Sequence, residues 1–101
     1  MTLGKAHSVD GVPIRLTEER WEHILDDHPE ISASDFDLLL DALEHPDYIL
    51  RGQTGTLIAV RALGKSSYLH VIYRKLSKND GFVITAGIRP RIDRKKIVWR
   101  R

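Results

Sequence analysis

The spacing of apolar residues changes once along this chain, at His45-Pro46, and this change constrains the fold. Before His45, apolar side chains recur at intervals of three and four residues, as on one face of an α-helix. After Pro46 they alternate with polar residues, as in half-buried β-strands. A chain that changes from the helical to the strand period is expected to pack helices against an antiparallel sheet, which is an α+β fold.

Two helices are predicted in the first half of the chain. Thr17 is a favourable N-cap, and the apolar spacing from Trp21 to His28 predicts a helix over about residues 18–27. Pro29 is expected to end this helix. A second helix is predicted from Ser34 to His45-Pro46, with its apolar stripe at positions 36, 39, 40 and 43.

The second half is predicted to form strands. Its alternating segments are 48–51, 56–63, 67–76, 81–88 and 96–100, and one further short strand is expected before the first helix, over 12–16. The links between these segments are short and contain glycine, which favours antiparallel hairpins. We therefore expect a single domain over residues 1–101, with two N-terminal helices packed on one face of a four- to five-stranded antiparallel sheet.

Charge is divided between the two halves. Residues 17–47 contain eleven acidic residues and one base, Arg20, whereas residues 48–101 contain thirteen Lys and Arg against Asp80 and Asp93. If the halves form different faces of one domain, the basic face is suited to a polyanion, and nucleic acid is the usual polyanion.

Several classes of protein are excluded or disfavoured by composition. There is no cysteine, which excludes disulfides and thiolate sites, and the N-terminus lacks the core of a signal peptide. We expect a soluble, cytoplasmic protein with no membrane contact. His23 and His28 are five residues apart, a spacing that does not direct two imidazoles at one ion, so no metal and no cofactor is expected.

Alternation assigns the strand residues to two faces. The mostly apolar set is expected under the helices: Ile58, Val60, Ala62, Leu69, Val71, Tyr73, Phe82, Ile84, Ala86, Ile88, Ile97 and Trp99. The other set is expected on the open face: Arg61, His70, Arg74, Thr85 and Arg89, with Leu57, Tyr68, Ile72 and Val83 among them.

The open face would carry the residue types that cleave RNA without a metal. This reaction needs a base for the ribose 2′-OH, an acid for the departing 5′-oxygen, and cations or hydroxyl donors for the charge of the transition state. His titrates near pH ~6.5 and serves as base or acid, Arg binds phosphate in a bidentate manner, and Thr donates a hydrogen bond. Residues on adjacent strands come within reach of each other.

Each sheet candidate also has a purely structural interpretation, because a solvated antiparallel face is polar in any case. His70 could bond a neighbouring carbonyl group or Asp80. Arg61 and Arg74 could serve solubility, and β-propensity alone explains Thr85.

The helical histidines and the C-terminal segment leave similar alternatives. His28 lies in the apolar stripe of the first helix, where it could be a core or capping residue, and His23 is expected on the solvated side. The C-terminal segment could be a solubility tail, but its bases are interrupted by apolar residues, which favours an arm that follows a phosphate backbone. Its bases are Arg89, Arg91, Arg94, Lys95, Lys96, Arg100 and Arg101.

The sequence also resembles a known family over nearly its whole length from about residue 12. The relevant segments are 16–24 (LTEERWEHI), 28–30 (HPE), 45–49 (HPDYI), 68–72 (YLHVI), 81–86 (GFVITA) and 97–99 (IVW). They resemble the phage-type branch of the barnase-EndoU-colicin-RelE nuclease superfamily. The most specific pieces are the W-x-H-I segment with H-P-E and the strand that ends in I-T-A.

The resemblance implies small metal-independent RNases of two helices and a four-stranded antiparallel sheet, which often act as toxins or effectors. It points to His23 or His28 from the helix and Thr85 from the sheet as catalytic residues, with Arg61 as a phosphate ligand. An aromatic residue often follows the Thr-Ala pair in this family. Here Gly87 follows, and Tyr68 or Tyr73 would have to supply a stacking platform.

Three hypotheses follow. The first is a metal-independent endoribonuclease, toxin-like, that leaves 2′,3′-cyclic phosphate ends, with His28 or His70 as the acid/base group. Around the phosphate it would place Arg61, Arg74 and Thr85, and along the RNA it would place Arg89, Arg91, Lys95 and Lys96. The second is a non-catalytic RNA-binding module with the same fold. The third is an interaction protein whose acidic helices bind a basic protein such as an antitoxin or inhibitor.

Overall fold

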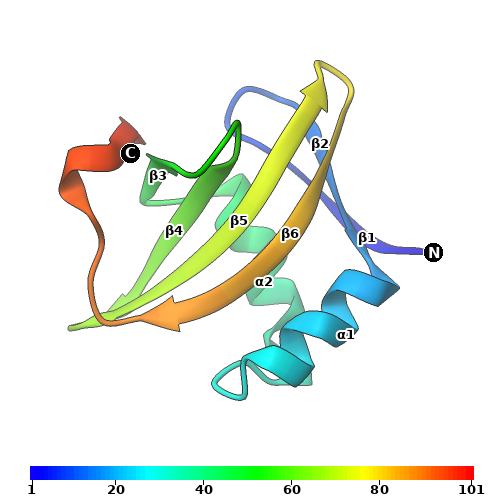
Figure 1. Cartoon of the computed structure of the whole chain (residues 1–101), viewed down its shortest axis with the longest axis horizontal. Helices are drawn as coiled ribbons and strands as arrows, with labels where there is room; N and C mark the ends of the chain where they lie inside the picture. Colours follow the sequence, from blue (N-terminus) through cyan, green and yellow to red (C-terminus); the bar gives the residue numbers. More distant parts are fainter.

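The computed structural model describes residues 1–101 as two α-helices and a seven-stranded sheet (Figure 1). The helices are α1 (Glu18–Asp27) and α2 (Phe36–Glu44), with 3₁₀ turns at Ala33–Asp35 (η1) and Arg94–Lys96 (η2). The strands are β1 (Thr2–His7), β2 (Pro13–Thr17), β3 (Tyr48–Arg51), β4 (Leu57–Gly64), β5 (Ser67–Ser77), β6 (Asp80–Arg89) and β7 (Ile97–Arg100). Their order across the sheet is β1-β2-β6-β5-β4-β3-β7.

The α+β class fits, but the predicted sheet is wrong in its size, its pairing and its relation to the helices. The sheet has seven strands, and it is mixed because β2 runs parallel to β6. The helices do not both stand at the N-terminus, since β1 and β2 precede α1. Strand β1 was not predicted because its sequence, Thr2–His7, has few of the β-branched and aromatic residues that mark strands.

The parallel contact of β2 with β6 depends on long-range partners. Arg15 donates two hydrogen bonds to the Asp80 carboxylate, at 2.8 Å from Nε and 3.0 Å from Nη2. Gly81 leaves room for the Ile14 side chain of β2, since a Cβ there would lie 2.6 Å from Ile14 Cδ1, and it would also lie 2.7 Å from the Arg74 carbonyl oxygen of β5. The contacts between β2 and β6, Arg15 with Asp80 and Ile14 with Gly81, join residues far apart in sequence, so local patterns do not reveal this pairing.

Helix α1 has the predicted bounds and the predicted N-cap. Thr17 Oγ1 accepts a hydrogen bond from the Arg20 N–H at 3.2 Å, and Glu18 and Glu19 suit the positive end of the helix dipole. The helix ends where the His28 N–H bonds the Ile24 carbonyl. The second helix is shorter than predicted, because its first residues form the 3₁₀ turn η1.

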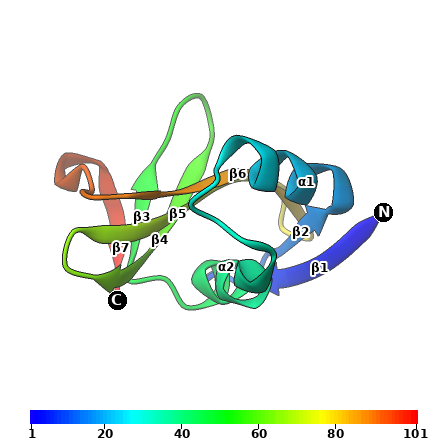
Figure 2. The ribbon, with the colours of Figure 1, turned by 90° about the horizontal axis from the view of Figure 1, so that it is seen from below.

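One hydrophobic core joins both helices to the sheet. Sixteen buried residues form it, among them Trp21 and Ile24 of α1 and Leu39 and Leu43 of α2. Trp21 meets Phe36 edge to face, with ring centroids 5.4 Å apart. Figure 2 shows both helices at the end of the molecule that carries β1 and β2, away from β7.

Strand β4 is turned the opposite way from the prediction. Ala59 of β4 is opposite Val71 of β5, and both lie in the core. Leu57, Ala59 and Arg61 therefore face the helices, whereas Ile58, Val60 and Ala62, predicted to be covered, lie on the other face. The error arose because both alternating sets of this strand begin with apolar residues.

The faces predicted for β5 are confirmed, and those predicted for β6 are confirmed only beyond a bulge. On β5, Leu69, Val71 and Tyr73 are in the core. Thr85 pairs with Ile72 and Val83 pairs with Tyr73. Ile84, between them on β6, therefore has no partner on β5 and forms a β-bulge. Val83 consequently lies in the core, and Phe82 and Ile84 do not.

Candidate functional site

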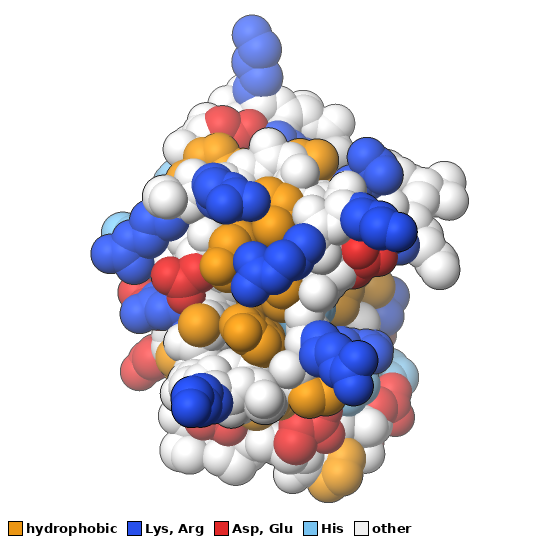
Figure 3. Space-filling view, turned by 90° about the vertical axis from the view of Figure 1, so that its left-hand side faces the viewer, with side chains coloured by type: hydrophobic (Ala, Val, Ile, Leu, Met, Phe, Trp, Pro, Cys, Tyr) orange, Lys and Arg blue, Asp and Glu red, His pale blue; other side chains and the backbone are white.

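A groove lies on the sheet face opposite the helices. Its volume is about 740 Å³. Apolar side chains of three adjacent strands, Ile58, Ile72 and Ile84, line it together with Ile92. The basic lining residues are Arg51, Arg89, Arg91 and Lys96. The space-filling view shows apolar side chains at the centre of this side of the molecule with Lys and Arg around them (Figure 3).

The C-terminal arm, residues 90–96, supplies one side of the groove. It leaves the end of β6 and passes to β7, which pairs with β3 at the edge of the sheet. The Asp93 side chain accepts a hydrogen bond from the Lys95 N–H at 3.2 Å. The Arg94 guanidinium lies 5.8 Å from the centre of the Tyr48 ring, within cation–π range. Arg91, Asp93 and Lys96 of this arm line the groove.

His70 is a nearly buried member of the groove lining, with 6% of its surface exposed. It lies between Val60 of β4 and Gly87 of β6. Its Nδ1 is 3.1 Å from the Tyr68 carbonyl oxygen. A carbonyl oxygen only accepts, so Nδ1 carries the proton, and in the neutral ring Nε2 keeps its lone pair.

The surroundings of His70 favour the neutral ring. Burial lowers the pKa of His70 below its ordinary value of 6.5, the hydrogen bond to the Tyr68 carbonyl opposes this, and the positive charge of Arg89 lowers it further. The imidazole is therefore uncharged at neutral pH, and Nε2 can accept a proton.

The four groove cations are not neutralised by the rest of the chain. None of them forms an ion pair, whereas Arg15, Arg61, Lys75 and Arg101 all have carboxylate partners. Asp93 is the only acidic residue in the lining. A groove with unpaired cations and an apolar floor is suited to an anion that also has an apolar part, as a nucleotide has.

Some of the residues predicted for the site come together, and others do not. His70, Arg89, Arg91 and Lys96 all line the groove. Lys95 lies on the same arm but is not part of the lining. Arg74 is on the groove side of β5, but its Nη2 donates to the Thr54 carbonyl at 2.8 Å in the β3–β4 turn. Thr85 faces Ile72 across the β5–β6 pair and does not line the groove.

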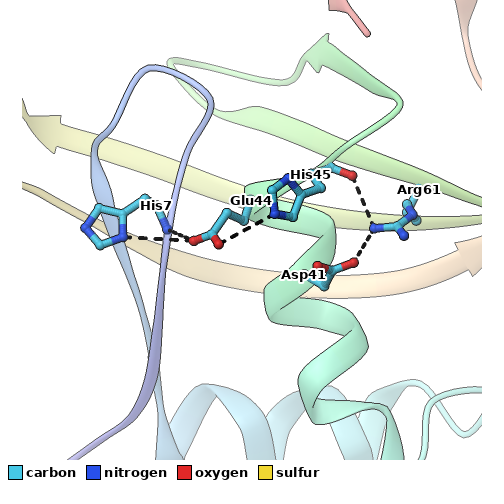
Figure 4. Close-up of polar contacts among 5 residues, drawn as sticks. All are labelled: His7, Asp41, Glu44, His45 and Arg61. Atoms are coloured by element: carbon cyan, nitrogen blue, oxygen red, sulfur yellow. Dashed lines mark hydrogen bonds and ion pairs between the residues drawn. The ribbon is translucent and has the colours of Figure 1, made fainter.

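Arg61 lies on the opposite face from the groove. Its Nη1 contacts the Asp41 carboxylate and lies 3.2 Å from the His45 carbonyl oxygen, at the C-terminal end of α2 (Figure 4). Beside it, the Glu44 carboxylate lies between His7 and His45. Arg61 therefore ties β4 to α2, and it does not share the groove with His70.

The two helical candidates are also outside the groove. His23 is exposed on α1, and His28 is partly buried at the C-terminal end of α1, with its Nδ1 3.2 Å from Glu30 Oε2. Tyr73 is buried in the core, where burial raises its pKa to about 12, so it offers no stacking platform. Tyr68 is partly exposed and lies opposite Arg89.

Ile72 was predicted on the groove face of the sheet, whereas Arg51 and the other three isoleucines of the groove were not. Arg51 ends the short strand β3, where it pairs with Leu57 and lines the groove. Ile58 and Ile84 were assigned to the covered face. Their positions follow from the orientation of β4 and from the β6 bulge, and neither feature has a local sequence signal.

Comparisons with known proteins give no match: no family model matches the chain, and no curated protein or solved structure is similar to it. No group of three or more His, Cys, Asp or Glu side chains is arranged to hold a metal ion. Neither helix has the length and apolar character needed to cross a bilayer.

Proposed function

We propose that the groove binds RNA and that the protein cleaves the bound strand without a metal ion. The observation that carries this proposal is the placement of His70, with an available Nε2, in a groove whose four cations have no carboxylate partners. The resemblance to the phage-type branch of the barnase-EndoU-colicin-RelE nucleases supports the same reaction class. A toxin role, and a protein antitoxin as partner, rest on that resemblance alone, and co-purification from native cells tests them.

In this reaction His70 acts as the general base. Nε2 removes the proton of a ribose 2′-OH, and the 2′-oxygen attacks the adjacent phosphorus to form a 2′,3′-cyclic phosphate. Arg89 and Arg91 stabilise the charge that builds on the phosphoryl oxygens. The bond to the 5′-oxygen breaks, and this oxygen takes its proton from water, because no second group that titrates near neutral pH lines the groove.

The test uses purified protein and mixed-sequence RNA in excess EDTA. We expect products with 2′,3′-cyclic phosphate ends, and we expect His70→Gln, purified in the same way, to cleave about 10²- to 10⁴-fold more slowly. His23→Gln is the matched control, because His23 is exposed and distant from the groove lining. Intact RNA, or cleavage that EDTA abolishes, would contradict the mechanism.

A second candidate is RNA binding without cleavage. It is favoured by the small exposure of His70, 6%, and by the single acid/base group in the groove. Under this alternative the wild-type protein binds RNA with an affinity that falls steeply with salt, the RNA stays intact, and His70→Gln binds as tightly as the wild type.

A further inference from the structure

The free edge of β6 is bonded by a carboxylate from the link between α1 and α2. Strand β2 pairs with β6 only at Gly81 and Phe82, so the later part of β6 has no strand neighbour on that side. There Glu30 Oε2 accepts hydrogen bonds from the Ile88 N–H, at 3.3 Å, and from His28 Nδ1, at 3.2 Å. The carboxylate thus occupies the place that a neighbouring strand would otherwise take.

The same pair of side chains packs on the residue before Ile88. A Cβ added at Gly87 would lie 3.3 Å from His28 Nδ1 and 3.4 Å from Glu30 Oε2. Such contacts are at or inside normal van der Waals distance, so the absence of a side chain at Gly87 allows His28 and Glu30 to approach the backbone of β6.

The segment that they hold carries the groove chemistry. Gly87 is the cross-strand partner of His70, and Arg89, two residues later, lines the groove and lowers the pKa of His70 through its charge. Ile88, whose N–H donates to the Glu30 carboxylate, lies between Gly87 and Arg89 in the sequence of β6. A shift of β6 at Ile88 would therefore move Arg89 relative to His70.

We propose that Glu30 and His28 are positioning residues, which hold Gly87 to Arg89 so that Arg89 stays beside His70 in the groove. His28 thus acts on the site through β6 and does not touch the substrate. The geometric part of this inference stands by itself, and only its consequence for RNA cleavage rests on the proposed function.

The experiment compares Glu30→Ala, Glu30→Gln and Glu22→Ala by NMR. Glu22 is the matched control, because it is an exposed acid of α1 without a partner. In Glu30→Ala we expect the Ile88 amide to exchange with solvent about 3- to 10-fold faster, the range that one lost hydrogen bond gives. Glu30→Gln keeps an acceptor oxygen, so we expect a smaller change, and Glu22→Ala should match the wild type.

The second readout is the titration of the His70 ring. Loss of a negative charge would by itself lower the pKa of His70, whereas displacement of Arg89 raises it, so an upward shift in Glu30→Ala identifies displacement. A folded Glu30→Ala protein with unchanged Ile88 exchange and an unchanged or lower His70 pKa would overturn the inference. Neither readout needs RNA. The inference about Glu30 and His28 can therefore fail or succeed independently of the cleavage test on His70→Gln.

Discussion

At the scale of single residues, the buried imidazole of His70 couples stability to pH. Burial lowers its pKa in the folded protein, whereas the unfolded chain takes up a proton near the ordinary value of 6.5. Between these two pKa values the unfolded state binds more protons than the folded state. The free energy of unfolding therefore rises with pH across this window and falls as pH decreases through it.

We expect His70→Gln to lessen the acid sensitivity of the fold. Between about pH 7.5 and about pH 5, the free energy of unfolding of the wild type should fall more than that of His70→Gln, because the variant has no imidazole to protonate. Urea denaturation at both pH values measures the difference. His23→Gln, which replaces an exposed histidine outside the groove, is the matched control. Equal pH dependence of the wild type and His70→Gln would contradict the prediction.

At the scale of secondary structure elements, the sequence predicts most boundaries well but not the arrangement of the strands. The bounds of α1 and β3 agree with the structure, because a cap, a proline and a clear period define them. The faces of β4 do not, since Leu57 and Ile58 begin two sets that are both apolar. The parallel contact of β2 with β6 was missed because Arg15 and Asp80, which support it, are 65 residues apart.

The candidate site was predicted only in part. His70 and Arg89 were placed on the groove side because the faces of their strands were predicted correctly there, whereas Arg61 was misplaced because the orientation of β4 was predicted wrongly.

Substitution of Arg61 tests that orientation. Arg61→Ala removes its contacts with Asp41 and the His45 carbonyl, so we expect the free energy of unfolding to fall by about 1 kcal/mol or less. RNA affinity should change less than in Arg89→Ala, which removes a cation from the groove lining. Chemical denaturation and fluorescence anisotropy with labelled RNA measure the two effects. A loss of affinity equal to that of Arg89→Ala would place Arg61 in the binding site after all.

The contact between β2 and β6 should be sensitive to a side chain at Gly81. Gly81→Ala places a Cβ 2.6 Å from Ile14 Cδ1 and 2.7 Å from a backbone oxygen, and we expect a loss of about 1–3 kcal/mol in unfolding free energy. Ile14→Val removes Cδ1 and with it one of these two contacts. The loss of unfolding free energy in the double variant should therefore be smaller than the sum of the losses in the two single variants. Thermal or urea unfolding of the four proteins measures this. An unchanged stability of Gly81→Ala would contradict the close contacts of Gly81 with Ile14 of β2 and with the Arg74 backbone of β5.

At the scale of the whole molecule, the unpaired cations of the groove and the exposed acids of α1 lie on different faces of the sheet. The acids Glu19, Glu22, Asp26 and Asp27 of α1 are exposed on the side of the sheet that carries the helices, whereas the groove lies on the opposite face, beside the C-terminal arm. A polyanion is therefore attracted to one face and repelled from the other, which orients it toward the groove.

Salt dependence of RNA affinity measures how many groove cations contact phosphates. For single-stranded RNA each contact contributes about −0.7 to the slope of log K against log salt, so four cations predict a slope of about −3. Arg89→Ala and Arg91→Ala should each flatten this slope by about 0.7. Lys5→Ala removes an exposed cation from β1, at the opposite edge of the sheet from β7, and should leave the slope nearly unchanged. Equal slopes for the wild type and the three variants would mean that the electrostatic part of RNA binding does not depend on the cations that line the groove. RNA would then bind elsewhere on the protein.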